Sequence, residues 1–443
     1  MRRRATWTST AIVIACTIVF SVRTATAGVY SYTLSYSADH SDNVGLTPTD
    51  PQNELTHTVS GAFTFNQVDR ELDARASGSA SYQEYQYNTF ADQATFGLDA
   101  ALFWKPLPET FQWAVNEVYT QVAASRTAAD TPANRLNANV LSTGPDFFWR
   151  VDPVNTIQLG TRYVSNTFSG TDNATLGADA DNARTNATVR WSYRYSPVTT
   201  LSIGHVTESV RFEEPGVGTN LDFRTNQADV SLINRRATNT FTVDLGETRV
   251  DRMGQPEIHG RLGRLSWTRQ LSSDSTFSLS AARSLSNAAG ELLAGSGSVG
   301  PVGAPLGVSS SDIFTARTVT LQYSRSLAGG TLSFSGFRIA RVFQLSTADN
   351  DDARGANVQY SRPFSERVTG TASIGYVKTL FPTIVREDKD KAAAASLQYR
   401  LTHTLFGALS VARRLRDSTD PSVEYEENRI VISLQYNSLP LRW

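Results

Sequence analysis

Residues 189–195 read Val-Arg-Trp-Ser-Tyr-Arg-Tyr, and this stretch decides the fold. The odd-numbered positions are apolar or aromatic, whereas the even-numbered positions are arginine or serine. Successive side chains of a β-strand point to opposite faces of a sheet, so this period of two predicts a strand with one apolar and one polar face. The same pattern recurs along the chain, for example over residues 277–285, 319–324, 395–401 and 430–436.

Aromatic residues end the apolar face of many of these segments, and a short polar connection follows. Such ends recur every 34–56 residues, which fits a hairpin of two roughly 10-residue strands, a short turn and a longer loop. A soluble β-sandwich also alternates, but aromatics at one level of every second strand favour a girdle at a membrane interface. The predicted girdle consists of Trp104, Trp149, Tyr193, Trp267, Tyr323, Tyr360, Tyr399 and Tyr436.

Short connections alternate with long polar ones. The long connections are rich in Asp, Asn, Gly, Ser and Thr, and they are predicted at 38–54, 125–134, 168–183, 213–221, 287–311, 345–353, 380–388 and 416–425. This asymmetry is typical of bacterial outer-membrane barrels, whose short turns are periplasmic and whose long loops are extracellular. We therefore expect an all-β protein, a transmembrane antiparallel β-barrel of about 18 to 20 strands with both termini in the periplasm.

The N-terminus has the features of an export signal. Arg2, Arg3 and Arg4 precede an apolar stretch at 11–20, and residues 25–27 read Ala-Thr-Ala, a cleavage site. We predict a signal peptide over 1–27 and an outer-membrane β-barrel over 28–443. Lipidation at Cys16 is the alternative, but the apolar stretch continues past this residue to Phe20.

Composition excludes several classes of protein. Lys and Arg number 41 against 42 Asp and Glu, so there is no basic excess to bind nucleic acid. The single Cys excludes a disulfide framework and a Cys-based metal site. Beyond the N-terminus no apolar run approaches the roughly 18 to 20 residues of a membrane-spanning helix.

The expected strand number implies an aqueous lumen. Barrels of about 16 to 18 strands already leave a channel, and alternation that starts at Val29 leaves no N-terminal domain to plug it. Any constriction must then come from a long loop that folds inward. The Gly- and Ser-rich stretch 287–311 is the best candidate, although a mobile surface loop is the simpler interpretation.

Four arginines on polar strand faces are the candidate lumen-facing charges: Arg190, Arg194, Arg264 and Arg400. They could attract anionic solutes or an acidic polysaccharide. They could instead be neutralised by neighbouring carboxylates or lie at the periplasmic rim, and we favour this structural interpretation because polar-face charge is expected in any water-filled barrel.

No residue pattern indicates an enzyme. The five His residues are scattered without the spacing of a catalytic triad or a metal site. The acidic run at 349–352 lacks the spaced ligands of a calcium loop, and it is interpreted as a solvated loop tip, as is the alternating run at 388–391. We predict no catalytic, cofactor-binding or metal-binding residues, and an outer-membrane hydrolase or lipid-modifying enzyme is the weakest alternative.

One stretch resembles a known family. It contains Trp113, Asn116, Gln121, Pro132, Asn134, Arg135, Asn139, the run Ser-Thr-Gly-Pro-Asp at 142–146, Asp152, Pro153, Asn155, Gly160, Arg162 and Tyr163, joined near the C-terminus by Tyr425, Glu427, Asn428, Arg429 and Tyr436. This sequence resembles the outer-membrane β-barrel porins associated with exopolysaccharide and PEP-CTERM (exosortase) gene clusters. The resemblance implies a barrel at the outer-membrane step of polysaccharide export, without catalytic residues.

Two local features bear on strand geometry, and the second of them departs from the family pattern. Gly144 and Pro145 interrupt a strand pattern and predict a bulge or bend. The chain ends on Pro440, Leu441, Arg442 and Trp443, whereas many similar barrels end on Phe, which leaves the register of the last strand open.

Together these features predict an outer-membrane channel for a hydrophilic solute, and the family resemblance implies that it takes part in exopolysaccharide export. The alternatives are a general or substrate-specific diffusion porin and a non-conducting structural barrel of the envelope. The expected partners are outer-membrane lipid, the barrel-assembly machinery, polysaccharide and periplasmic export components. Nucleic acid and cofactors are not expected.

Overall fold

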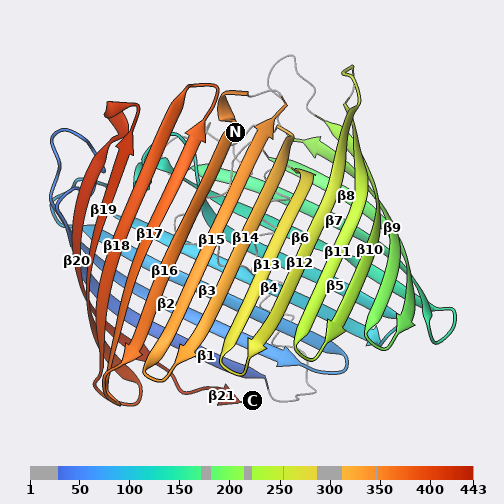
Figure 1. Ribbon diagram of the computed structural model, residues 1–443, viewed down its shortest axis with the longest axis horizontal. Coiled ribbons are helices and arrows are strands. Elements are labelled where there is room, and N and C mark those ends of the chain that lie inside the picture. Colours follow the sequence, from blue (N-terminus) through green and yellow to red (C-terminus); the bar gives the residue numbers. More distant parts are fainter. Residues whose placement is uncertain are drawn as a thin grey trace, which may run out of the picture.

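The computed structural model describes residues 28–170, 181–213, 222–252, 254–286, 312–344 and 347–442. These ranges form a closed antiparallel β-barrel of 20 long strands and one two-residue strand (Figure 1). The strands are β1 (Val29–Ser41), β2 (Glu54–Val68), β3 (Leu72–Tyr85), β4 (Gln93–Leu107), β5 (Phe111–Ala123), β6 (Arg135–Arg150), β7 (Asn155–Gly170), β8 (Asn182–Ser196), β9 (Thr199–Phe212), β10 (Phe223–Arg236), β11 (Asn239–Arg252), β12 (Ile258–Ser272), β13 (Ser275–Ser286), β14 (Phe314–Leu327), β15 (Gly330–Phe343), β16 (Asp351–Pro363), β17 (Val368–Phe381), β18 (Arg386–Arg400), β19 (Leu405–Ser418), β20 (Tyr425–Asn437) and β21 (Leu441–Arg442).

Three short 3-10 turns complete the described secondary structure: η1 (Pro132–Asn134), η3 (Thr347–Asp349) and η4 (Pro421–Val423). None of the helices in the described ranges is long and apolar enough to span a bilayer.

The barrel closes because β1 pairs with both β2 and β20. The closing register runs from Thr33 opposite Asn437 to Ser41 opposite Arg429. Beyond β20 the ladder breaks, and it resumes one residue out of step where Leu441 lies opposite Tyr30. Pro440 precedes this segment and has no N–H to donate to a ladder. The predicted all-β barrel is confirmed, and its 20 long strands are the upper figure of the predicted range.

The period of two builds the two faces of the wall. Trp191 of β8 lies opposite Ile203 of β9, and both side chains are exposed on the outside. Their neighbours Ser192 and Ser202 face the lumen, with hydroxyl oxygens 2.9 Å apart. Residues opposite each other in a ladder share a face, so the apolar positions of successive strands join into a continuous outer surface.

Connections of two to four residues join strands at the end where β1 begins, which we call the turn end. The connections at the other end, the loop end, are mostly longer, such as 42–53 between β1 and β2 and 124–134 between β5 and β6. The strands extend further than the sequence predicts, because residues 168–170, 386–388 and 416–418 belong to β7, β18 and β19 rather than to loops.

Turn carboxylates order the turn end. Asp152 Oδ1 accepts hydrogen bonds from the backbone N–H groups of Val154 and Asn155, each at 2.8 Å. Asp152 Oδ2 accepts a third from Asn155 Nδ2 at 2.8 Å. These bonds favour the ionised carboxylate, the side-chain bond most, so they lower the pKa of Asp152. The Ser272 hydroxyl lowers the pKa of Asp274 in the β12–β13 turn in the same way.

The bulge predicted at Gly144 and Pro145 does not form. Strand β6 continues through both residues, which lie opposite Ala114 and Trp113 of β5. On the other side the ladder to β7 has a gap between the pair Thr143–Tyr163 and the pair Asp146–Gly160. The register is the same on both sides of the gap, so no extra residue is inserted. Pro145 interrupts the pairing, as a residue without an N–H must, but the strand absorbs it.

Candidate channel lumen

Small hydroxyl side chains line much of the inner wall. They are paired across neighbouring strands, with oxygen–oxygen distances of 2.7 Å for Ser31 and Thr64, 2.6 Å for Ser35 and Ser60, 2.5 Å for Ser81 and Thr95, and 3.3 Å for Thr371 and Ser361. In each pair one hydroxyl donates its single O–H to the other, so both oxygens keep acceptor capacity and the accepting hydroxyl also keeps its own O–H to donate. This part of the lumen is therefore a neutral, hydrogen-bonding surface.

A run of inward charges follows the wall from β15 round to β1 near the loop end, and we call it the charged arc. It consists of Arg341, Asp351, Arg386, Asp388, Asp390, Arg414, Arg416, Glu427, Arg429 and Asp39. Arg386 binds Asp388 through two bonds of 2.8 and 2.6 Å, and Arg416 binds Asp390 through two of 2.7 and 3.1 Å. Five arginines face five carboxylates, so the arc is balanced.

The loop between β5 and β6, residues 124–134, reaches the charged arc. Strand β5 and strand β16 are eleven places apart in a 20-strand ring, so they lie on opposite walls. Even so, Nη1 of Arg126 is 2.8 Å from Oδ2 of Asp351. The same guanidinium donates to the carbonyl oxygen of Asp349 and lies 4.8 Å from the Phe343 ring centroid. The loop therefore crosses the lumen.

A second contact fastens the same loop. Nη1 of Arg386, on β18, donates to the carbonyl oxygen of Thr127 at 2.8 Å. Within the loop, Asn134 Nδ2 donates to the carbonyl oxygens of Ser125 and Ala129, and its Oδ1 accepts from the Ser125 N–H at 2.7 Å. The loop is thus internally ordered and anchored at two points of the far wall.

The ion pair at the far wall is buried. Side-chain exposure is 8% for Arg126, 1% for Asp351 and 3% for Arg341, whose Nη1 lies 2.9 Å from the same Asp351 oxygen. Two guanidiniums share one carboxylate, so removing Arg126 still leaves Asp351 paired. We call this arrangement the clamp. It closes part of the cross-section of the lumen, and its Arg126–Asp351 ion pair can separate.

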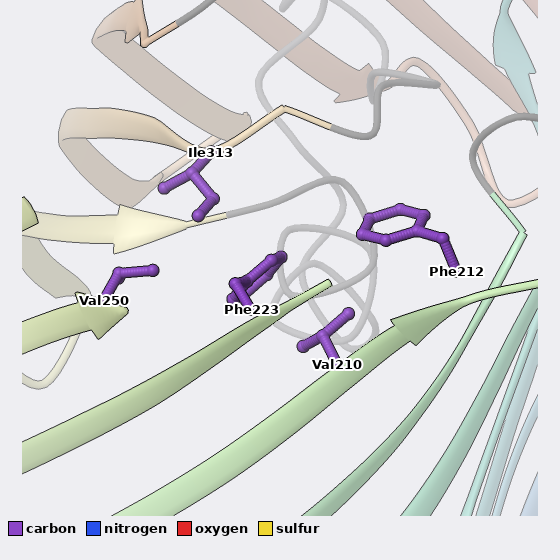
Figure 2. Packing of buried hydrophobic residues seen from close by; sticks show 5 residues of the cluster. All are labelled: Val210, Phe212, Phe223, Val250 and Ile313. Atoms are coloured by element: carbon purple, nitrogen blue, oxygen red, sulfur yellow. The ribbon is translucent and has the colours of Figure 1, made fainter. Parts of the chain in front are cut away.

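Apolar side chains pack on the inner face at the loop end of β9–β11. Val210, Phe212, Phe223 and Val250 form this cluster with Ile313, which directly precedes β14 (Figure 2). Arg252 lies beside it, 3.3 Å from Asp312 and 5.9 Å from the Phe223 ring centroid. The chain entering β14 therefore leans into the barrel. Residues 287–311, the best candidate from sequence for a constriction loop, lie outside the described residues.

The four candidate arginines occupy different positions. Arg190 reaches over Gly204 of β9 to Asp229 of β10, with Nη2–Oδ2 and Nη2–Oδ1 distances of 3.0 and 3.2 Å. Arg194 donates to the carbonyl oxygen of Pro153 at 2.8 Å, at the turn end.

Within the part of the chain that the structure describes, the side chains of the other two candidates form no hydrogen bond or ion pair. Arg264 lies opposite Asp244 in the β11–β12 ladder. Arg400 ends β18 at the turn end, where its backbone N–H donates to the carbonyl oxygen of Arg367. The structure does not bring the four candidates together into one site.

The eight predicted girdle aromatics lie near the turn end of the even-numbered strands. Trp104, Trp149, Tyr399 and Tyr436 are exposed on the outside, and the other four are partly exposed. Two indoles are fixed by amide oxygens: Trp267 Nε1 donates to Asn239 at 2.7 Å, and Trp191, which the prediction omitted, donates to Asn155 at 3.0 Å.

Two loop interpretations from sequence are wrong, and both concern the charged arc. Residues 388–391 belong to β18, where Asp388 and Asp390 face the lumen while Lys389 and Lys391 point outward. Asp351 begins β16 and is buried in the clamp. The sign of charge alternates over 388–391, which is itself a period of two, and it would have indicated a strand had charged residues been scored like apolar ones.

The run that carried the family resemblance forms a buried polar contact at the gap in the β6–β7 ladder. Arg162 Nη2 lies 2.5 Å from Oδ2 of Asp146, and its Nη1 donates to the carbonyl oxygen of Pro145 at 3.1 Å. Gln112 donates to the same carboxylate at 2.9 Å. A Cβ at Gly160 would lie 2.5 Å from Asp146 Oδ1, so the glycine leaves room for the carboxylate. These residues replace the missing ladder bonds.

No group of three or more His, Cys, Asp or Glu residues in the described ranges is placed to bind a metal ion. His259 lies between Glu247 and Glu257, with nitrogen–oxygen distances of 3.4 and 3.5 Å, on the exposed outside. His57 Nδ1 contacts the hydroxyl of Tyr36 at 2.8 Å, also on the outside.

A closed barrel with an apolar outer surface and a polar lumen defines an integral outer-membrane protein of the porin-like class. The family model described as "Putative beta-barrel porin 2" matches residues 350–438, which comprise β16 to β20 and part of the charged arc. The chain is an integral outer-membrane β-barrel and a porin-like channel.

The chain is also similar to several solved structures of Pseudomonas aeruginosa proteins. A variant of the ferric enterobactin receptor in complex with enterobactin is 12% identical, covers 92% of this chain and 81% of its own, and has a TM-score of 0.46. The corresponding values for OccK2 are 11%, 93%, 98% and 0.38, and for OpdK 14%, 94%, 99% and 0.37. No curated protein matches the sequence.

Proposed function

We propose that this protein is a loop-constricted diffusion channel that passes hydrophilic solutes across the outer membrane. The clamp is the observation that carries the proposal. A barrel of about 20 strands would otherwise enclose a wide aqueous lumen, and the loop 124–134 crosses that lumen to the Arg126–Asp351 ion pair. A narrower bore limits the size of the solutes that can pass, and a barrel with a purely structural role does not need such a limit.

The lining favours neutral, hydroxyl-rich solutes. Hydroxyl pairs such as Ser35–Ser60 present hydrogen-bonding groups without charge, and the charged arc is balanced. A lumen with a large excess of positive or negative charge would select ions through its electrostatic field. This lumen instead selects solutes through hydrogen bonds with its lining and through the width of its bore. Saccharides are the solute class that fits this surface.

Exopolysaccharide export is the more specific candidate, supported by the sequence resemblance and by the hydroxyl lining. A polymer must pass the loop 124–134 along its whole length, so export requires the clamp to open. In that case the Arg126–Asp351 pair separates when a periplasmic export component engages the barrel, and Arg341 keeps Asp351 neutralised meanwhile.

Conductance of the purified, refolded mature chain in a planar lipid bilayer tests the proposal. We expect stable current steps that neutral oligosaccharides block in a concentration-dependent way, with acidic oligosaccharides of equal length blocking no better. Neutral polymers of increasing size would give the bore. Absence of steps from folded, heat-modifiable protein would overturn the channel and favour a structural barrel. Loss of surface polysaccharide on gene deletion, with small-solute uptake unchanged, would select export over general diffusion.

A further inference from the structure

Four outward-facing arginines lie on four neighbouring strands, in the yellow-to-orange part of Figure 1. They are Arg283 of β13, Arg317 of β14, Arg338 of β15 and Arg354 of β16, and all four are exposed. We call them the outer arginine cluster. Arg283 lies directly opposite Arg317, and Arg338 lies directly opposite Arg354. Like charges in directly opposed positions repel each other, so this wall requires an anion.

The protein supplies one carboxylate to the cluster. Asp352 binds Arg338 through two bonds of 3.1 and 2.6 Å. Within the residues that the structure describes, Arg283, Arg317 and Arg354 form no ion pair. Several basic side chains elsewhere on the outer wall have acidic partners, as with Lys378 and Lys389, which lie 2.6 and 3.2 Å from Glu387. The cluster is thus a local excess of three positive charges.

The depth of the cluster makes that excess costly in plain lipid. Arg317 and Arg354 lie six residues along their strands from the girdle residues Tyr323 and Tyr360, or about 20 Å at about 3.3 Å per residue. A strand tilt of about 40° makes this about 15 Å along the barrel axis. The apolar band of such barrels is about 25 Å tall, and arginine on the lipid face is destabilising within it. The guanidiniums therefore lie in the membrane half nearer the loop end, where a lipid headgroup can reach them.

A hollow lies between the guanidiniums. Its volume is about 530 Å³. Arginines Arg283, Arg317 and Arg338 border it, and its floor is apolar, formed by Val243, Leu245, Leu265, Ala281, Val319 and Ala340. Gly263, opposite Arg283, contributes no side chain, and a Cβ built there meets no atom within 4 Å. The cationic rim suits a phosphate group and the apolar floor suits an acyl chain, so the hollow matches a lipid that carries both.

We propose that the outer arginine cluster binds the phosphates of a phosphorylated, multiply acylated glycolipid of the lipid A type, in the leaflet at the loop end. Guanidinium groups bind phosphate oxygens in a bidentate manner, and two phosphates on one disaccharide can neutralise the three unpaired arginines. An acyl chain of the same molecule lies in the hollow. A carboxylate patch on a second copy of the chain would supply charge but would leave the apolar floor uncovered.

Native mass spectrometry of the full mature barrel in detergent tests this inference. The probe is bisphosphorylated lipid A, compared with the same lipid dephosphorylated and with phosphatidylglycerol. The triple variant Arg283→Gln, Arg317→Gln, Arg354→Gln removes the unpaired charges. The matched control is Arg224→Gln, Arg249→Gln, Arg261→Gln, three outward arginines that each lie opposite or beside Asp251 or Glu247.

We expect one tightly bound lipid A per barrel, a loss of affinity of about tenfold or more in the triple variant, and an unchanged affinity in the control. Equal binding by the triple variant would overturn the inference. Equal binding of dephosphorylated lipid A or of phosphatidylglycerol by the unmodified barrel would also overturn it, and this arm needs no variant to fold. A dimer that forms through this wall and excludes lipid A would replace the lipid by a second copy.

Discussion

Arg126 and Asp351 belong to opposite walls of the barrel, yet their side chains form a buried ion pair of 2.8 Å inside it. The pair joins the β5–β6 loop to the first residue of β16. Because Arg341 shares the same carboxylate oxygen at 2.9 Å, Asp351 is neutralised whether or not the loop is in place. The wall is therefore complete without the loop, and the loop can move without leaving a buried charge unpaired.

Replacing Arg126 by Gln should widen the channel. The substitution removes the ion pair with Asp351 and the contact with the Phe343 ring, whereas the barrel keeps all its ladders. We expect a higher single-channel conductance, of the order of twofold, and entry of larger neutral polymers, because lining loops set bore and selectivity. Planar bilayer recordings give both quantities.

The control for this prediction is Arg135→Gln. Arg135 begins β6, directly after the same loop, and pairs with Asp130 of the loop, not with the far wall. Its removal should leave conductance and polymer exclusion unchanged. If Arg126→Gln and Arg135→Gln conduct alike, the clamp does not limit the bore.

Replacing Arg190 by Gln should make the channel more cation-selective. Asp229 is nearly fully buried and lies 3.0 Å from Arg190 across Gly204. Without Arg190 its negative charge faces the lumen uncompensated, and lumen substitutions tune selectivity. The reversal potential in a salt gradient should shift towards the cation equilibrium potential.

A second variant reaches the same carboxylate without removing a charge. A Cβ at Gly204 would lie 2.7 Å from Arg190 Nη2, so Gly204→Val should push the guanidinium away and shift selectivity in the same direction. Arg194→Gln removes an equal charge at the turn end, where the partner is the Pro153 carbonyl, and should shift it less. Equal shifts for Arg190→Gln and Arg194→Gln would show that net charge alone sets selectivity.

The fold follows from sequence because a period of two has few structural solutions. An outer face such as that of Trp191 and Tyr193 is apolar, the opposite face carries Arg190 and Ser192, and short turns recur at regular spacing. Only a closed sheet satisfies every backbone hydrogen bond in a membrane without exposing an edge. Strand pairing then follows chain order, so the topology needs no further information.

The lumen site could not be predicted in this way because its contacts are long-range. Nothing near Arg126 in the sequence indicates a partner 225 positions later at Asp351. The arginines that sequence favoured were chosen by strand face alone, which identifies lumen-facing positions but not ion pairs. Charged strand ends such as residues 386–391 extend beyond the apolar band, so hydrophobicity alone assigned them to a loop.

Replacing Gly144 by Ala should destabilise the barrel by about 1–3 kcal/mol. A Cβ there would lie 2.1 Å from the carbonyl oxygen of Thr161 on β7, so β6 and β7 must separate where Pro145 has already removed ladder bonds. Gly263→Ala is the matched control, because its Cβ meets nothing within 4 Å, and reduced freedom of the unfolded chain should leave it neutral or slightly stabilised. Urea unfolding in lipid vesicles compares the free energies of unfolding of the two variants. Equal values would show that β7 moves away from the added Cβ at little cost.

Acidification should loosen the β6–β7 turn only when the pH falls below 3.8, the ordinary pKa of an aspartate. Three hydrogen bonds, the largest effect coming from Asn155 Nδ2, lower the pKa of Asp152 from its ordinary value of 3.8. A lowered pKa in the folded state means that the carboxylate's contribution to stability is complete above 3.8 and is lost as the pH falls through the lower value. The Asn155 backbone amide, followed by NMR in micelles, should therefore titrate with a midpoint below 3.8. In Asp152→Asn the amide oxygen can still accept the backbone bonds, so the turn should persist and that titration should disappear. A midpoint at or above 3.8 in the unmodified chain would mean that these bonds do not stabilise the charged form.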